Sequence, residues 1–170
     1  FRHDPNDTNS LSYDKVTTLY EDRQGTLWVG TGFLWHGGDL RLRDITLKQG
    51  GLNRFNRANK NFTRYVHDPN DPSSLIDNRV RAIFEDRKGR FWVGTSGDGL
   101  HTMNREKGSF ERHRYNSTDP NGLSRPPVGN TMPWSDDMIT FIREDTVGII
   151  WIGTLMGGLN RYDPQNRKMN

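Results

Sequence analysis

Pairs of adjacent carboxylates are the residues whose types best suit acid–base chemistry in this sequence. They are Glu21-Asp22, Glu85-Asp86 and Glu144-Asp145. Cleavage of a glycosidic bond needs two carboxyl groups that flank one bond. Neighbouring residues on a strand point to opposite faces, so the two members of a pair cannot face each other across a substrate. Each pair also occupies the same place in a string written three times. We therefore interpret these carboxylates as turn residues that build the fold.

The histidines give little support for catalysis or metal binding. His3 and His67 both precede "DPND", which favours a turn or packing role. The oxygens of "DPND" suggest a calcium loop, but the spacing of an EF-hand is missing. His101 and His113 have no metal-like partner at a useful spacing, so we expect solvated strand positions. Neither Gly-x-Ser-x-Gly nor His-Glu-x-x-His occurs, and we predict no catalytic residue, no metal and no cofactor.

Composition narrows the class of protein. Hydrophobic residues make up 31% of the 170, yet the chain holds 18 Gly, eight Phe and five Trp, which favours many short strands joined by turns. It contains no cysteine, which excludes disulfides, thiolate zinc sites and Cys nucleophiles. The net charge is +3, but no run of Lys or Arg predicts a nucleic-acid partner. No apolar stretch is long enough for a membrane span, so we expect no membrane contact within this segment.

The recurring string reads "EDRQGTLWVGT" at 21–31, "EDRKGRFWVGT" at 85–95 and "EDTVGIIWIGT" at 144–154. It belongs to a unit of about 48 residues, a period typical of propellers or solenoids. In the second unit "VRAIFE", the turn "DRKG" and "RFWVGT" predict a hairpin, and "GLHTMN" and "SFERHRY" predict a second one. Four antiparallel strands without room for a helix predict a propeller blade.

The sequence thus predicts an all-β fold with about three blades of a larger ring, since propellers typically have about 4 to 8. Blade 1 covers 1–65 with a loop insertion near 33–49, blade 2 covers 66–115, and blade 3 covers 116–170 with an insertion near 123–137 and a truncated outer strand. The central strands are apolar on both faces, as burial between neighbouring blades requires. The glycines that follow the tryptophans fit a close backbone approach. The structural repeat positions are Trp28, Trp92, Trp151, Gly30, Gly94, Gly153, Asp22, Asp86 and Asp145.

The combination of the acidic pair, the turn glycine, "WVGT" and "GGLNRF" closely resembles the two-component regulator propeller repeat. In that family such repeats form the extracytoplasmic sensor region of bacterial hybrid histidine kinases and related regulators. The resemblance implies ligand sensing, a periplasmic or extracytoplasmic location and a kinase elsewhere in the parent protein. The chain departs from the pattern at its two insertions and at "DGLHTM", where His101-Thr102 replaces the usual Asn-Arg pair.

The two insertions are the predicted binding region. Chain direction reverses at each strand, so the loop between the second and third strands and the loop entering the next blade emerge on the same face. Loops on a rigid scaffold often carry binding function, and an exposed Trp suits the apolar face of a sugar ring. Anchoring of long loops by buried Trp is the alternative. The candidate ligand-binding residues are Trp35, His36, Asp39, Arg41, Asp98, Trp134, Asp136 and Asp137.

We expect a non-catalytic, ligand-sensing propeller segment that binds an oligosaccharide or small polar ligand. Its other expected partners are the remaining blades of the parent chain and a second copy in a homodimer. A propeller enzyme acting on polysaccharide, such as a lyase or glycosidase, is one alternative. A protein-interaction scaffold is another, because one propeller architecture hosts many functions.

Overall fold

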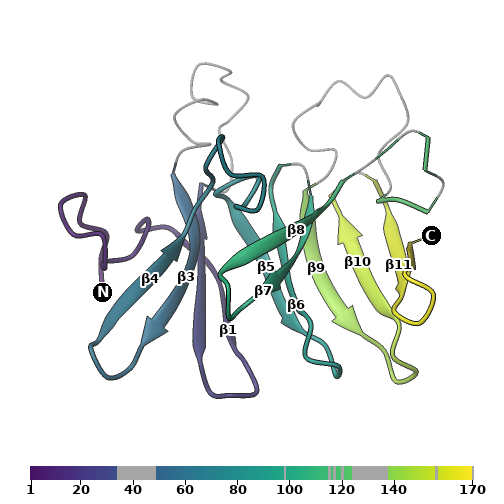
Figure 1. Ribbon diagram of the computed structural model, residues 1–170, viewed down its shortest axis with the longest axis horizontal. Helices are drawn as coiled ribbons and strands as arrows, with labels where there is room; N and C mark the ends of the chain where they lie inside the picture. Colours follow the sequence, from purple (N-terminus) through teal and green to yellow (C-terminus); the bar gives the residue numbers. More distant parts are fainter. Residues whose placement is uncertain are drawn as a thin grey trace.

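The computed structural model describes residues 1–33, 49–97, 99–114, 116, 118–119, 121–123, 138–155 and 157–169. Every strand within these residues belongs to one of three four-stranded antiparallel sheets that stand side by side (Figure 1). The first sheet contains β1 (Val16–Glu21), β2 (Leu27–Gly32), β3 (Gly50–Asn56) and β4 (Asn61–Tyr65). The second contains β5 (Val80–Glu85), β6 (Phe91–Thr95), β7 (Leu100–Asn104) and β8 (Ser109–His113). The third contains β9 (Ile139–Glu144), β10 (Ile150–Thr154), β11 (Leu159–Asp163) and β12 (Lys168–Met169).

Each sheet follows the strand order of the chain, so the described part of the molecule is an all-β set of three propeller blades, as the sequence predicts. First strands adjoin one another, with β5 between β1 and β9. The outer strand of the third blade is two residues long. The boundaries after residues 65 and 115 stay predictions. Within the described residues no helix has the length and apolar character of a membrane span.

A tight turn built on Asp22 closes the first hairpin. The N–H of Gly25 donates to the carbonyl of Asp22 (2.9 Å), and Oδ1 of Asp22 accepts the N–H groups of Gln24 (3.0 Å) and Thr26 (2.9 Å). Gly25 has φ 76°, a left-handed conformation that glycine adopts without steric cost. The same bonds recur at Asp86 and Asp145. The carboxylate therefore fixes the turn of each blade.

The second carboxylate oxygen of the same Asp accepts a hydrogen bond from the indole of the repeated Trp in its own blade. Trp28 Nε1 donates to Asp22 Oδ2 at 2.8 Å, and Trp151 Nε1 donates to Asp145 Oδ2 at 2.8 Å. The corresponding bond in the second blade is 3.2 Å. Burial raises the pKa of Asp22, but the bonds from Trp28 and the turn N–H groups outweigh it and hold the pKa below its usual value. Asp thus ties the hairpin turn to the core.

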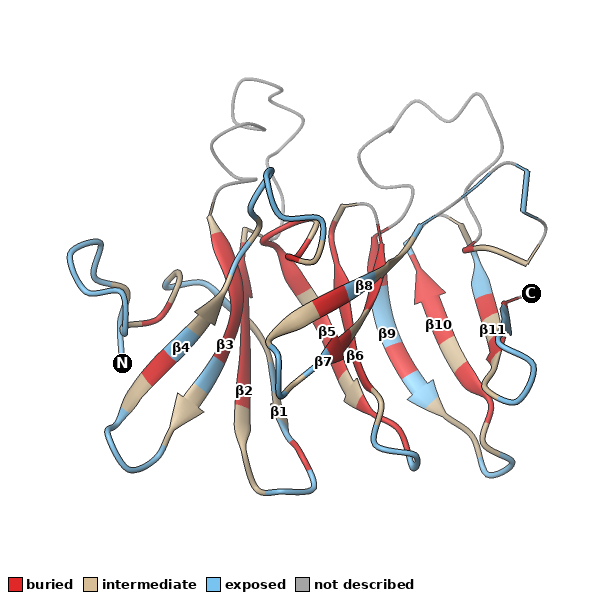
Figure 2. Cartoon of the chain, in the orientation of Figure 1, coloured by how far each residue is buried: buried red, intermediate tan, exposed pale blue. Residues whose placement is uncertain are grey.

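The cores lie between blades. The ring of Trp28 packs against Phe91 of the second blade, with centroids 4.7 Å apart, and Trp92 packs against Tyr162 of the third, at 5.1 Å. Both indoles are buried, and Figure 2 shows β6 buried along its length. Trp151 is only half-buried, because no described sheet follows the third blade. Burial on both faces is thus complete only for central strands that have a blade on each side.

Glycines after the tryptophans let neighbouring blades approach closely. A Cβ on Gly94 would lie 2.5 Å from Ile139 of the third blade, closer than real Cβ contacts allow. A Cβ on Gly30 would lie 2.5 Å from Thr18 of its own blade and 2.9 Å from Val80 of the second blade. The third blade differs, because the ring of Phe141 from the same blade lies over Gly153. Close approach is therefore the reason for glycine at the two inter-blade positions.

The rest of the recurring string links one blade to the next. Glu85 Oε2 accepts the N–H of Arg23 at 2.9 Å, and the Arg23 guanidinium donates to the carbonyl of Arg87 at 2.9 Å. The next junction repeats both bonds: Glu144 accepts the N–H of Arg87 (2.8 Å), whose guanidinium donates to Thr146 (3.0 Å). At both junctions, the Glu side chain thus accepts a hydrogen bond from the preceding blade, and the Arg side chain donates one to the following blade.

His101 contradicts its predicted solvated position, because the side chain is completely buried. Its Nδ1 donates to the carbonyl of Val93 and its Nε2 accepts the N–H of Ile76, both at 3.2 Å. In the first blade Asn53 makes the equivalent bonds to a strand carbonyl and a loop N–H. Burial lowers the pKa of His101 to about 3. The imidazole replaces the amide because it too offers one donor and one acceptor.

The prediction for His113 is also wrong. Its ring is half-buried and lies 5.7 Å from the ring of Trp92. Burial lowers the pKa of His113 as well.

Candidate functional site

The described flanks of both insertions lie at one edge of the sheets. In each blade, the residue that ends or follows the second strand donates its N–H to the carbonyl just before the first strand, for example Gly32 to Lys15 at 3.0 Å. The matching bonds are Ser96 to Arg79 and Leu155 to Met138, each 2.9 Å. These bonds place the end of every second strand beside the entry to its first strand. We call this the loop edge; it lies opposite the hairpin turns (Figure 1).

The predicted ligand-binding residues cannot be placed at this edge from the structure. All of them lie outside the described residues: Trp35, His36, Asp39, Arg41, Asp98, Trp134, Asp136 and Asp137. Their role stays a prediction.

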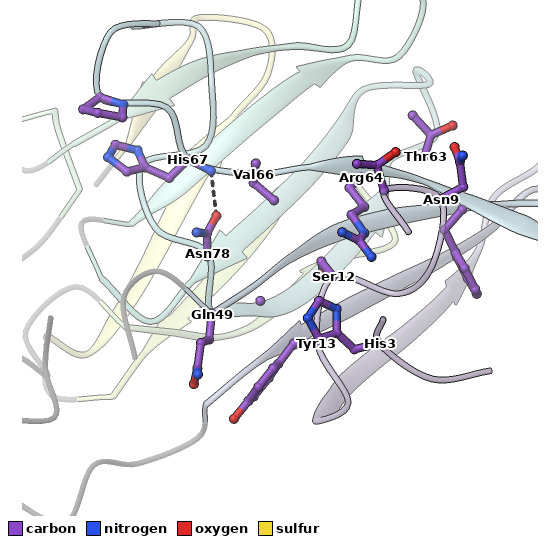
Figure 3. A pocket seen from close by; sticks show the side chains of 14 residues that line it. His3, Asn9, Ser12, Tyr13, Gln49, Thr63, Arg64, Val66, His67 and Asn78 are labelled. Atoms are coloured by element: carbon purple, nitrogen blue, oxygen red, sulfur yellow. Dashed lines mark hydrogen bonds between the residues drawn. The ribbon is translucent and has the colours of Figure 1, made fainter. Parts of the chain in front are cut away.

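A cleft that the sequence analysis missed opens at the loop edge. Its volume is about 1090 Å³, and it lies between two "DPND" loops, the first at 1–15 and the second at 66–79. Figure 3 shows His3 and Tyr13 of the first loop on one side and His67 and Asn78 of the second on the other. Gln49, the first described residue after the insertion near 33–49, also lines it. We call this space the interloop cleft.

Both loops are built in the same way. His3 Nδ1 donates to the carbonyl of Leu11, and His67 Nδ1 donates to that of Leu75, each at 2.7 Å. Nδ1 is the donor because a carbonyl only accepts, so Nε2 is the nitrogen left for other partners. The backbone N–H of His67 donates to Asn78 Oδ1 at 2.6 Å. These bonds give both histidines the structural role that their repeat position favours.

An arginine on the outer strand fastens each loop to its sheet. Arg64 Nε donates to the carbonyl of Ser10 at 2.6 Å, and its terminal nitrogen donates to Asp7 at 2.7 Å and Leu11 at 2.9 Å. Arg112 makes the equivalent bond to Ser74 at 3.0 Å. These bonds anchor both walls of the interloop cleft to the outer strands of their blades.

The "DPND" carboxylates serve the loops themselves. Asp4 Oδ1 accepts the N–H of Asn6 and Asp7 Oδ1 accepts that of Asn9, both at 2.8 Å, which is the usual bonding of an Asx turn. In the described ranges no group of three or more His, Asp or Glu side chains is placed to hold a metal ion. The carboxylates of Asp4 and Asp7 thus stabilise the turns of the loop that forms one wall of the cleft.

The chemistry of the interloop cleft suits reversible binding. None of its described lining residues is Asp or Glu, so these residues supply no carboxylate pair for acid–base catalysis. The amide of Gln49 and the hydroxyl of Tyr13 can donate and accept hydrogen bonds, and the half-exposed Tyr13 ring offers an apolar face. A ligand rich in hydroxyl groups matches this lining.

Sequence comparisons match parts of the chain. The model described as two component regulator propeller matches residues 10–33 and 74–97. Histidine kinase P4 of Formosa agariphila is 42% identical over 53 residues, which is 31% of this chain and 4% of that kinase.

Solved structures share the fold. The extracellular domain of a hybrid two-component system from B. thetaiotaomicron superposes with a TM-score of 0.67 at 22% identity, covering 100% of this chain and 20% of that one. Virginiamycin B lyase from Staphylococcus aureus superposes with a TM-score of 0.58 at 16% identity, covering 95% of this chain and 42% of the lyase. The chain spans less than half the length of each.

Proposed function

We propose that this chain is a non-catalytic, ligand-sensing stretch of propeller in the extracytoplasmic part of a two-component sensor; the two component regulator propeller model that matches residues 10–33 and 74–97 supports this. The similarity to a histidine kinase and to the extracellular domain of a hybrid two-component system supports the sensory assignment. The likeness to a lyase concerns the fold alone and carries no reaction with it.

The observation that carries the proposal is the interloop cleft. It joins walls anchored to the outer strands with a lining of donors and acceptors, at the edge where the first insertion leaves the sheet. We propose that it binds an oligosaccharide or another small polar ligand, with Gln49 as a hydrogen-bonding residue and Tyr13 as an apolar platform. Such a ligand buries a ring face on the aromatic side chain and exchanges hydroxyl–water bonds for hydroxyl–protein bonds.

Signal transmission follows from the position of the cleft. One wall belongs to the loop that packs on the first blade, and the other to the loop that packs on the second. A ligand that contacts both walls favours one relative arrangement of the two blades. Binding therefore shifts the equilibrium between the arrangements of the two blades. The size of this shift is set by the difference in ligand affinity between the arrangements. In a sensor, that change in packing or in dimer arrangement would pass across the membrane.

Binding can be tested by calorimetric titration of the purified chain with a panel of plant and host oligosaccharides. We expect at least one to bind, and Gln49→Ala to weaken it about fivefold, the effect of one neutral hydrogen bond. Gln24→Ala is the matched control, because Gln24 is exposed in a hairpin turn at the opposite edge. Equal effects of the two variants, or a panel without a binder, would contradict the proposal. New reducing ends during incubation would favour the enzyme alternative instead.

A further inference from the structure

A second concave surface runs along the first strands of the three blades. It has a volume of about 250 Å³ and is lined by residues of β1, β5 and β9, the strands that converge on one another. We call it the axial groove. Among its described lining residues are two arginines, Arg81 and Arg143, and no Asp or Glu. The groove therefore carries positive charge that its own walls do not balance.

Arg81 stands at an irregularity of the sheet. The register of β5 against β6 shifts between Val80 and Ala82, which makes Arg81 the extra residue of a β-bulge. A bulge takes a side chain out of the regular alternation and re-aims it, and bulges are over-represented beside binding sites. The equivalent bulge residue in the first blade is Thr17, whose hydroxyl donates to the carbonyl of Val80 at 2.6 Å. At the bulge, the middle blade thus has the cation Arg81, whereas the first blade has the small hydroxyl of Thr17, whose hydrogen bond is made within the protein.

The guanidinium of Arg81 lacks an anionic partner among the described residues. It is half-buried, and its hydrogen bond is to Met138 Sδ at 3.4 Å, a weak acceptor. Other buried or half-buried arginines in the described ranges donate to oxygen acceptors: Arg79 pairs with Asp77 at 2.6 Å, and Arg64 donates to the carbonyl of Ser10 at 2.6 Å. Removing a cation from water without a counter-charge is costly. Arg81 is therefore positioned to gain from an anion supplied by a ligand.

The electrostatic environment agrees with this geometry. Burial lowers the pKa of Arg81, and the positive charge of Arg79 lowers it further. An anion beside Arg81 would offset both.

We propose that the axial groove binds an anionic group, a carboxylate or sulfate carried by a small polar ligand, with Arg81 as its main contact and Arg143 as the second. The planar guanidinium matches either oxyanion with two parallel hydrogen bonds. The hydroxyl of Thr140, an exposed groove residue next to Phe141 on β9, supplies a further donor. This site is separate from the interloop cleft and does not depend on the function proposed for it.

The test is NMR titration of the purified chain with D-glucuronate, D-glucose 6-sulfate and D-glucose at constant ionic strength, following arginine Nε–H signals. We expect the two anions to shift the Arg81 signal and glucose to leave it in place. Arg81→Gln should weaken anion binding about tenfold and Arg143→Gln about threefold, as losses of charge-assisted hydrogen bonds. Arg57→Gln is the matched control, since Arg57 is 62% exposed near the hairpin turns, and it should change nothing.

Arg81→Lys keeps the positive charge but loses the two parallel N–H donors of the guanidinium, so it should retain part of the affinity for the anion. This variant also serves as the test if Arg81→Gln does not fold. Absence of anion-induced shifts at Arg81 would overturn the proposal. So would equal shifts with glucose, or equal weakening by the Arg57 and Arg81 variants, which would indicate unspecific charge attraction. Oligosaccharide binding that depends on Gln49 would leave the sensory proposal intact whatever the outcome at Arg81, because the two sites are separate.

Discussion

Acid should destabilise this protein through His101, a residue that the hydrogen-bonding pattern keeps neutral. Its Nε2 must accept the N–H of Ile76, so protonation breaks that bond and leaves a buried charge. Burial sets its pKa at about 3, against 6.5 for an exposed histidine. A folded-state pKa below the unfolded value means that the unfolded chain takes up protons first as the pH falls. The stability is therefore complete above about pH 6.5 and declines from there towards about pH 3.

The size of the effect follows from the same two pKa values. Each pH unit between them costs about 1.4 kcal/mol. From about pH 7.5 to about pH 4.5, His101 alone should lower the free energy of unfolding by about 3 kcal/mol. Carboxylates with lowered pKa values, such as Asp22, add to acid destabilisation at lower pH. A variant that removes only the histidine separates the two contributions.

His101→Asn is that variant, because Asn53 makes the equivalent hydrogen bonds at the same position of the first blade. Urea unfolding at the two pH values should show similar stability of both proteins near neutrality. It should also show a loss on acidification that is smaller by about 3 kcal/mol in the variant. His113→Asn is the control, with a smaller change expected because His113 is only half-buried. Equal acid losses for wild type and His101→Asn would refute the assignment of a buried neutral imidazole.

Three further substitutions test how the blades are held together. Trp92→Ala should lower the free energy of unfolding by about 3 to 5 kcal/mol, because the ring is completely buried; an unchanged melting temperature would contradict the blade core. Gly94→Ala should cost about 1 to 3 kcal/mol by pushing Ile139 away, and a variant as stable as wild type in denaturant unfolding would disprove the close approach. Glu85→Gln should cost about 2 kcal/mol, whereas Glu21→Gln at the same repeat position should stay within about 0.5 kcal/mol because Glu21 is exposed. Similar losses for the two Glu variants would argue against a stabilising role for the charge of Glu85, which pairs with Arg105.

The repeated string predicted the fold because its turn residues act on backbone groups only a few positions away in the sequence. An Asp first and a Gly fourth in a turn act through their own backbone, so the hairpin at Asp22 can be read from a few residues. The structural role of the acidic pairs followed from strand alternation and repetition. The bond from Trp28 to Asp22 was missed, because a spacing of six residues gives no direction for the indole. Only the paired strands bring the two side chains together.

The candidate site was less predictable. The sequence drew attention to the insertions, whose predicted ligand residues lie outside the described residues. The interloop cleft joins residues that are far apart in the chain, such as His3 and His67, and each loop alone looks like ordinary turn chemistry. The repeated "His-Asp-Pro-Asn-Asp" was the available signal, because equivalent loops on adjacent blades lie side by side at the same edge. For His101, the lack of a metal-like partner at a useful spacing favoured a solvated position, whereas the structure buries the ring and satisfies both of its nitrogens.

The sequence by itself determined the number of blades, the place of every hairpin and the residues that repeat, because these depend on short-range spacing and alternation. Tertiary structure decided which side chains of one blade meet those of the next. It placed Glu85 on the backbone of Arg23, Ile139 over Gly94, and Arg81 in a groove whose described lining residues include no carboxylate. Such contacts depend on the relative position of sheets, and side-chain packing between blades sets that position.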